Sequence, residues 1–355
     1  MDKTPVIIIC SVLSFLLSVI IIPIVIRTCK KNNWYDTINS RKVHEGLIPR
    51  LGSIGIFISF GISLIVYNVI NSIPVWNIWQ LFIAGLIIFI FGVLDDFINL
   101  NPYFKVTIQI ISAALVTFSS FYLHTIFGIT LPVFIGRVVT FLWIILLVNS
   151  FNLIDGLDLL CGGISFLTLL TGGIYLLIAE QPLGLTYFLL CSSILGFLIY
   201  NKPPAKIFLG DGGSQTLGYF VSIIPLFPIK TNLETINIFA FLLLVSIPCT
   251  DVIAAIWRRI REHRSFFTAD RGHIHHKLVN IGFSKIKASM FLLSLQAVIC
   301  IIVLLSLFMI NKKDAIILLA VSILLIWIFF STLHYINRSV NIKHTGHLDE
   351  APQKK

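Results

Sequence analysis

The stretch that decides the fold is residues 5–26, PVIIICSVLSFLLSVIIIPIVI, which contains no charged side chain and is apolar on every helical face. A helix needs about 20 mostly apolar residues to cross a bilayer. A strand of a membrane barrel would alternate apolar and polar residues, and this stretch does not alternate. Residues 5–26 therefore predict a transmembrane helix.

The same apolar pattern recurs along the whole chain. Hydrophobic residues make up 57% of the 355 residues and charged residues only 12%, whereas a soluble domain has about 25% charged residues. A water-soluble globule could not bury so much apolar surface, so a cytosolic enzyme, a disordered chain and a small secreted module are excluded. About eleven apolar runs predict membrane helices near 5–27, 51–70, 79–94, 106–124, 137–151, 160–178, 183–200, 214–229, 236–256, 288–310 and 314–333. We therefore predict an all-α polytopic membrane protein.

The placement of Lys and Arg predicts the orientation of this bundle, because cytoplasmic loops carry an excess of them. With the N-terminus outside, 21 of the 26 basic residues lie on the cytoplasmic side and five on the other. The C-terminus is then cytoplasmic, with a basic tail over about 334–355. Connections are short, so we predict a single integral membrane domain over residues 1–355. The net charge of +10 follows from this asymmetry and does not indicate nucleic-acid binding.

Acidic side chains are scarce, and several gather at loops on the predicted cytoplasmic face. Asp95 and Asp96 end the third apolar run, Asp155 and Asp158 follow the fifth, and Asp211 precedes the eighth. Alternate loops of a helical bundle return to the same face, so these carboxylates can converge. Because a charge drawn into the membrane costs on the order of 2.5–3.5 kcal/mol, paired acids at a helix end favour a function.

Cations and histidines gather at the same face. Lys42 and His44 lie in the first inner loop, and the last long inner loop contains Arg271-Gly-His273-Ile-His275-His276. Carboxylate oxygens suit Mg²⁺ or Mn²⁺, and Gly-rich segments let backbone N–H groups approach an anion. Together these groups are suited to phosphoryl transfer by positioning and charge neutralisation. The membrane setting indicates that one substrate is a lipid.

Five motifs in this order resemble the polyprenyl-phosphate N-acetylhexosamine-1-phosphate transferases, in particular the WecA/TagO-like branch of the MraY superfamily. The motifs are Arg41-Lys42-x-His44 with Pro49-Arg50, Asp95-Asp96, Asn149-x-x-Asn152-x-x-Asp155-Gly156-Leu-Asp158, Phe208-x-Gly-Asp211 and Asp270-Arg271-x-His273-Ile-His275-His276. One departure is Leu159, which follows Asp158 where the family usually continues with Gly.

The resemblance implies a reaction and a location. The enzyme would transfer N-acetylhexosamine-1-phosphate, with GlcNAc-1-phosphate favoured, from a UDP-sugar to undecaprenyl phosphate and release UMP. This is the first membrane step of a cell-surface glycan pathway, such as that of lipopolysaccharide or teichoic acid. The resemblance further implies a multi-pass homodimer in the bacterial cytoplasmic membrane, with its active site facing the cytoplasm.

The resemblance also implies a role for each motif residue. The implied ligands of Mg²⁺, or of Mn²⁺ in its place, are Asp211 and Asn152. The implied catalytic residues are Asp95, Asp96, Lys105, His273, His275 and His276. The implied substrate-binding residues are Asn149, Asp155, Gly156, Asp158, Phe208, Arg271, Lys42 and His44.

Three other functions use similar residues. A transporter or lipid flippase would use intramembrane acids for ion coupling, but such residues lie near the bilayer midplane, whereas these acids lie at one edge. A metal-dependent lipid phosphatase would use the same acids with water as the nucleophile and would need no nucleotide pocket. A family member without activity could serve as a scaffold.

Overall fold

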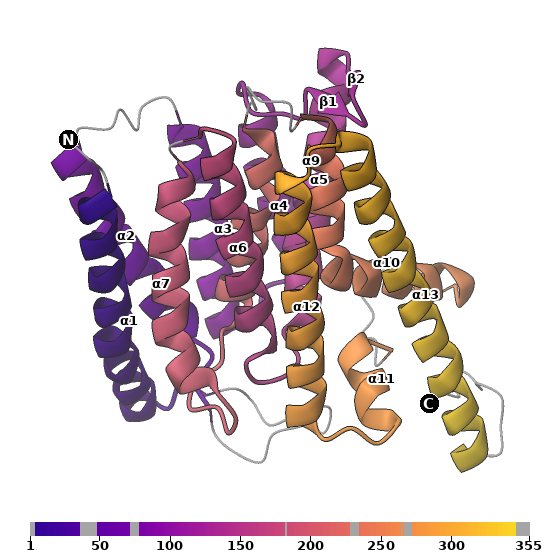
Figure 1. The fold of residues 1–355 in the computed structure, drawn as a ribbon. Coiled ribbons are helices and arrows are strands. Elements are labelled where there is room, and N and C mark those ends of the chain that lie inside the picture. Colours follow the sequence, from indigo (N-terminus) through magenta and orange to yellow (C-terminus); the bar gives the residue numbers. More distant parts are fainter. Residues whose placement is uncertain are drawn as a thin grey trace.

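The computed structural model describes residues 4–35, 48–71, 78–181, 183–227, 234–263, 265 and 272–345. These residues form a bundle of long helices (Figure 1), so the predicted all-α class is confirmed. The helices are α1 (Thr4–Asn32), α2 (Gly52–Asn71), α3 (Trp79–Ile98), α4 (Pro102–Thr117), α5 (Val133–Ile154), α6 (Leu160–Ile178), α7 (Gly184–Asn201), α8 (Asp211–Ser222), η2 (Ile224–Leu226), α9 (Glu234–Leu244), α10 (Ser246–Arg261), α11 (Ile274–Asn280), α12 (Lys285–Phe308) and α13 (Lys312–Thr345).

Most of these helices are suited to crossing a membrane. Within the described ranges, eight are long and apolar enough to do so, and nine if the bent pair α9–α10 counts as one span. Large apolar side chains such as Ile65 and Val69 on α2 and Phe134 on α5 are exposed on the outside of the bundle, where lipid would cover them. The chain is therefore a multi-pass membrane protein.

Two predicted spans are shorter as helices than the apolar runs that contain them. The run 106–124 holds α4, which ends at Thr117, and the chain then forms an antiparallel hairpin of β1 (Thr125–Ile126) and β2 (Ile129–Thr130). The run 214–229 holds α8, which ends at Ser222 and is followed by the short helix η2. Pro225 lies in η2 and lacks the N–H that an α-helix would need there.

A third predicted span, 236–256, is broken. Helices α9 and α10 meet at Val245 with a bend of 71°, so that α10 turns away from the bundle axis (Figure 1). Pro248, in the first turn of α10, cannot donate the hydrogen bond that the Leu244 carbonyl would accept in a continuous helix. The buried Gln296 of α12 replaces that bond, since its Nε2 donates to the Leu244 carbonyl oxygen at 2.9 Å and to Thr168 Oγ1 at 3.0 Å.

We predict that Gln296→Leu destabilises the protein by about 1–3 kcal/mol, because it leaves the buried Leu244 carbonyl without a hydrogen bond. Thermal unfolding in detergent should show a melting temperature several degrees lower. Ser294→Ala on the exposed side of the same helix is the control, and it should melt like the parent. An unchanged melting temperature for Gln296→Leu would show that the bend does not depend on this side chain.

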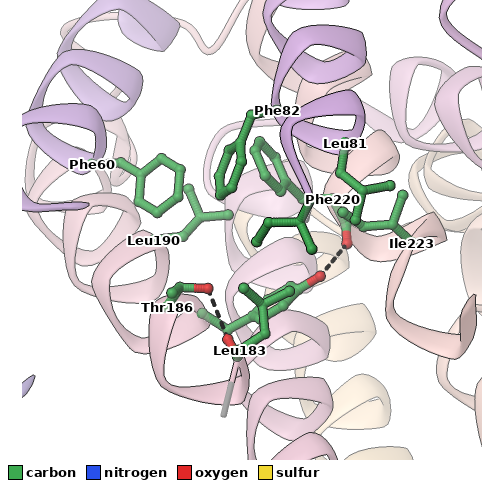
Figure 2. A pocket seen from close by; sticks show the side chains of 10 residues that line it. Phe60, Leu81, Phe82, Leu183, Thr186, Leu190, Phe220 and Ile223 are labelled. Atoms are coloured by element: carbon green, nitrogen blue, oxygen red, sulfur yellow. Dashed lines mark hydrogen bonds between the residues drawn. The ribbon is translucent and has the colours of Figure 1, made fainter. Parts of the chain in front are cut away.

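One small cavity inside the bundle has no charged lining. Figure 2 shows its aromatic and aliphatic side chains, including Phe60 and Phe220. The volume of the cavity is about 20 Å³. The hydroxyls beside it are already used: Thr186 Oγ1 donates to the Leu183 carbonyl oxygen at 2.8 Å, and the Tyr187 hydroxyl donates to the Phe220 carbonyl oxygen at 3.2 Å. This cavity is a packing feature of the helices and offers no group for chemistry.

Candidate active site

The charged centre of the protein consists of Arg50, Asp95, Lys105 and Asp211. Lys105 Nζ lies 3.3 Å from Asp211 Oδ2 and also forms an ion pair with Asp95 Oδ2. Arg50 Nη2 lies 3.5 Å from Asp211 Oδ1. The end of α3 and the starts of α2, α4 and α8 therefore meet here. The predicted convergence of the Asp95 and Asp211 carboxylates is confirmed in the structure, and Lys105 pairs with both.

Asp96 fixes the start of α8. Its two carboxylate oxygens accept hydrogen bonds from the backbone N–H groups of Asp211, at 2.8 Å, and Gly212, at 3.0 Å. These N–H groups have no partner within their own helix, and the positive end of the helix dipole favours an anion there. Gly210, just before the helix, has φ +80°, and a Cβ on it would lie 2.1 Å from the Arg50 carbonyl oxygen. Only glycine fits at this position.

A tight turn between α3 and α4 brings Lys105 back onto Asp95. Asn99 ends α3 in the left-handed conformation, and Asn101 caps α4 by accepting the Tyr103 N–H at 3.0 Å. Asp95 is only 3% exposed, and its Oδ1 accepts the Leu100 N–H at 2.7 Å. The Asp95 carboxylate is thus held by the turn on one oxygen and by the Lys105 ammonium on the other.

Asp211 is suited to binding a cation. Two cations hold its carboxylate in the charged form, with Lys105 Nζ 3.3 Å from Oδ2 and Arg50 Nη2 3.5 Å from Oδ1. Asn152 contacts the same helix, since its Oδ1 accepts the Ser214 hydroxyl at 2.9 Å, one turn into α8 from Asp211. In the described part of the chain, no three His, Cys, Asp or Glu residues form a metal cluster. Since Mg²⁺ commonly takes one or two carboxylates plus substrate phosphates, Asp211 and Asn152 fit as its donors.

Asn149, predicted to bind substrate, belongs to a network of side-chain amides below the centre. Its Nδ2 donates to Gln109 Oε1 at 2.8 Å, and Gln109 Nε2 donates to Gln215 Oε1 at 3.1 Å. The network joins α4, α5 and α8. Sequence analysis missed Gln109 and Gln215, although an amide in an otherwise apolar helix is the signal that would have found them.

Asp158 fixes the loop between α5 and α6. Its Oδ2 accepts the Ala205 N–H at 3.0 Å, and its carbonyl oxygen accepts the Ser289 hydroxyl at 3.1 Å. The next residue, Leu159, has φ +69° and donates its N–H to Asn201 Oδ1 at 2.9 Å. This left-handed conformation favours glycine, which explains why the resembling family usually has Gly at this position.

The histidine motif packs against the same loop. A Cβ on Gly156 would lie 2.3 Å from His275 Nε2, so the missing side chain makes room for the imidazole. The rings of His275 and His276 are 4.3 Å apart, and those of His273 and His275 are 5.8 Å apart. Burial, followed by the charge of His276, lowers the pKa of His275 to about 3. His275 is therefore neutral at physiological pH, and its buried Nδ1 has no hydrogen-bond partner within the described part of the chain.

Asp251, which sequence analysis left unassigned, positions this motif. It is fully buried in α10; its Oδ1 accepts the Ile274 N–H at 3.0 Å, and its Oδ2 lies 3.1 Å from His273 Nδ1. It thus caps α11 and orients the first histidine.

Of four further predicted substrate-binding residues, the structure describes only Phe208. Lys42, His44 and Arg271 lie outside the described residues. Phe208 lies beside the start of α2: its N–H donates to the Pro49 carbonyl oxygen at 2.8 Å, and its carbonyl oxygen accepts the Gly52 N–H at 2.9 Å. This pairing places Arg50 next to Asp211.

Asp155 is a carboxyl group whose charge is disfavoured. It caps the end of α5, where burial and the charges of Asp211 and Asp158 raise its pKa to about 7, although Arg50 opposes the shift. The folded protein therefore holds a proton that the unfolded chain releases near pH 4. Stability is lost as the pH rises from about 4 to 7, because the carboxyl must ionise in an unfavourable place.

We predict that Asp155→Asn removes this cost. The variant should melt a few degrees above the parent at pH 8 and at the same temperature as the parent at pH 4. Thermal unfolding across this pH range measures the difference, with the exposed Asp314→Asn on α13 as a control that should show no such trend. A pH-independent difference for Asp155→Asn would contradict the assignment.

The fold and the site together define a multi-pass membrane protein with a cluster of paired charged side chains where four of its helices meet. Residues 78–228 match the model of glycosyl transferase family 4. The chain belongs to this family of membrane glycosyl-phosphate transferases.

Three curated relatives illustrate the similarity. The chain is 33% identical over 287 residues, 78% of each chain, to a probable undecaprenyl-phosphate N-acetylglucosaminyl 1-phosphate transferase of Bacillus subtilis (strain 168). It is 32% identical over 286 residues, 77% of each chain, to an undecaprenyl-phosphate alpha-N-acetylglucosaminyl 1-phosphate transferase of Yersinia pestis. The Escherichia coli (strain K12) protein of that name is 32% identical over 276 residues, covering 74% of this chain and 73% of its own.

Proposed function

We propose that this protein transfers GlcNAc-1-phosphate from UDP-GlcNAc to undecaprenyl phosphate. The charged centre around Asp211, at the edge of a membrane bundle, is the observation that carries the proposal. The names of the relatives identify undecaprenyl phosphate and an N-acetylglucosaminyl 1-phosphate group. They do not favour a transporter, a flippase or a lipid phosphatase.

The proposed reaction is a displacement at phosphorus. A phosphate oxygen of undecaprenyl phosphate attacks the β-phosphorus of UDP-GlcNAc, which carries the sugar. The bond from this phosphorus to the bridging oxygen breaks, and UMP leaves with that oxygen and the bonding electrons. The product is undecaprenyl-pyrophosphoryl-GlcNAc, the first lipid-linked unit of a cell-surface glycan pathway such as that of lipopolysaccharide or teichoic acid.

Asp95 and Asp96 have different proposed parts in this reaction. Both oxygens of Asp96 accept backbone N–H groups of α8, so we assign Asp96 to holding Asp211 in place. Asp95 faces Lys105, and we assign these two to the lipid phosphate: Lys105 would attract the phosphate oxygens, and Asp95 would accept a proton from the phosphate if it carries one. The histidines of α11 would hydrogen-bond the donor pyrophosphate or sugar.

Asp211 with Asn152 would hold Mg²⁺, or Mn²⁺ in its place. When bound, the ion would neutralise charge on the donor pyrophosphate. The loop between α5 and α6 would bind the nucleoside through Asp155, Gly156 and Asp158, with Phe208 near the uracil. The further contacts of the donor would come from Asn149, Arg271, Lys42 and His44.

The proposed topology has eleven crossings. It counts α4, the α8–η2 unit and the bent α9–α10 pair as spans in addition to the eight long helices. The distribution of Lys and Arg supports an outside N-terminus and a cytoplasmic C-terminus, with a single domain and the charged centre on the cytoplasmic side of the bacterial plasma membrane. We further propose that the enzyme is a homodimer.

We predict that Asp211→Asn abolishes Mg²⁺-dependent release of UMP from UDP-GlcNAc and undecaprenyl phosphate in detergent. An amide cannot replace the anionic oxygen that a hard cation prefers. Asp314→Asn is the matched control, and it should keep parental turnover. Parental turnover in Asp211→Asn would contradict the metal assignment.

The same assay identifies the donor. Parallel reactions with UDP-GlcNAc, UDP-GalNAc and UDP-MurNAc-pentapeptide should release UMP fastest from UDP-GlcNAc. Faster turnover of either other donor would overturn the assignment of the sugar and leave the reaction class intact.

A further inference from the structure

A second cavity lies away from the charged centre, between α10, α11 and α13. Its volume is about 590 Å³, within the range of roughly 300–1,000 Å³ that is typical of ligand pockets. Its walls come from the lipid-side half of α10, the short helix α11 and the cytoplasmic half of α13. Figure 1 shows α10 crossing toward α13, and residues of both helices line the cavity.

The lining of this cavity combines positive charge with aromatic surface. Three arginines and one lysine line it, and among the described residues no Asp or Glu does. The cations are Arg258, Arg261, Lys277 and Arg338. Arg261 also has a long ion pair with Glu262, at 3.8 Å, on the exposed surface, which is worth little. Arg258, Lys277 and Arg338 have interactions of their own as well, and within the described part of the chain the formally charged side chains of the lining are all basic.

The aromatic part of the lining indicates what kind of anion these cations would bind. Trp257 is 66% exposed and Trp327 is 49% exposed, and the exposed aliphatic side chain of Ile253 also lines the cavity. Trp and Tyr beside arginine are typical of the membrane interface. A water-soluble anion would make no contact with the apolar side chains of the lining. A phospholipid would contact the arginines with its phosphate and the tryptophans with the upper part of an acyl chain.

The cavity is separate from the place where the acceptor lipid must react. None of Asp95, Lys105 and Asp211 contributes to its lining. A phosphate held by Arg261 and Arg338 is therefore held by a different set of groups from one at the charged centre. We propose that this cavity binds one anionic phospholipid of the membrane, which stays bound while the acceptor reacts elsewhere. The separation from the acceptor rests on the proposed function, whereas the binding of a phospholipid does not.

The test uses the full chain, freed of lipid in detergent, with phosphatidylglycerol as the anionic probe and phosphatidylcholine as the neutral one. Native mass spectrometry should show one tightly bound phosphatidylglycerol and no comparable phosphatidylcholine. The double variant Arg261→Gln/Arg338→Gln should bind phosphatidylglycerol roughly 30-fold more weakly, because each basic residue near a membrane surface contributes about 1 kcal/mol. Both positions are exposed, so the variant should fold.

The matched control is Lys30→Gln/Lys31→Gln, which removes two exposed cations from the end of α1 and should leave binding unchanged. Equal binding of phosphatidylglycerol by the parent and the Arg261/Arg338 variant would overturn the proposal. So would displacement of the bound lipid by equimolar undecaprenyl phosphate, since the cavity would then belong to the acceptor.

A second measurement uses the parent protein. Phosphatidylglycerol with brominated acyl chains should quench tryptophan fluorescence, and Trp257→Phe should remove part of that quenching. The same quenching in Trp257→Phe as in the parent would contradict a lipid chain in this cavity.

Discussion

The Asp96 carboxylate accepts the two first N–H groups of α8, and the geometry of the charged centre depends on this contact. It requires α3 and α8 to approach closely, and glycine makes that approach feasible: a Cβ on Gly92 would lie 2.6 Å from the Gly212 Cα. With the helix start fixed, the Asp211 carboxylate faces Lys105 and Arg50. A larger residue at Gly92 would separate the helices and move Asp211 away from its cations.

The few carboxylates near this end of the bundle divide into three kinds. Asp96, Asp158 and Asp251 accept backbone N–H groups and hold loops or helix ends together. Asp95 and Asp211 share Lys105 and are the acids that we assign to the lipid phosphate and the metal. The pKa of Asp155 is raised, so its ionised form destabilises the folded protein. Such a perturbed pKa is typical of a functional site. The acids that hold backbone N–H groups thus position the acids to which we assign the reaction.

The sequence predicted much of this, since uniformly apolar runs are long-range signals that need no tertiary information. Every predicted run overlaps a helix, and the return of alternate loops to one face predicted that the Asp95 and Asp211 carboxylates can converge. It could not predict the bend at Val245, because Gln296, far along the chain, supplies the hydrogen bond that Pro248 lacks. Asp251 was missed for the same reason: its partners Ile274 and His273 lie on another helix.

The central claim is that Asp211 meets the metal and the donor while Asp96 holds α8. The most direct test is an experimental structure of the full chain with Mn²⁺ and UDP-GlcNAc, in which the anomalous signal locates the metal. The account predicts the anomalous peak in contact with the Asp211 carboxylate, with both oxygens of Asp96 still on the N–H groups of Asp211 and Gly212. A peak on Asp96, with those N–H groups released, would contradict it.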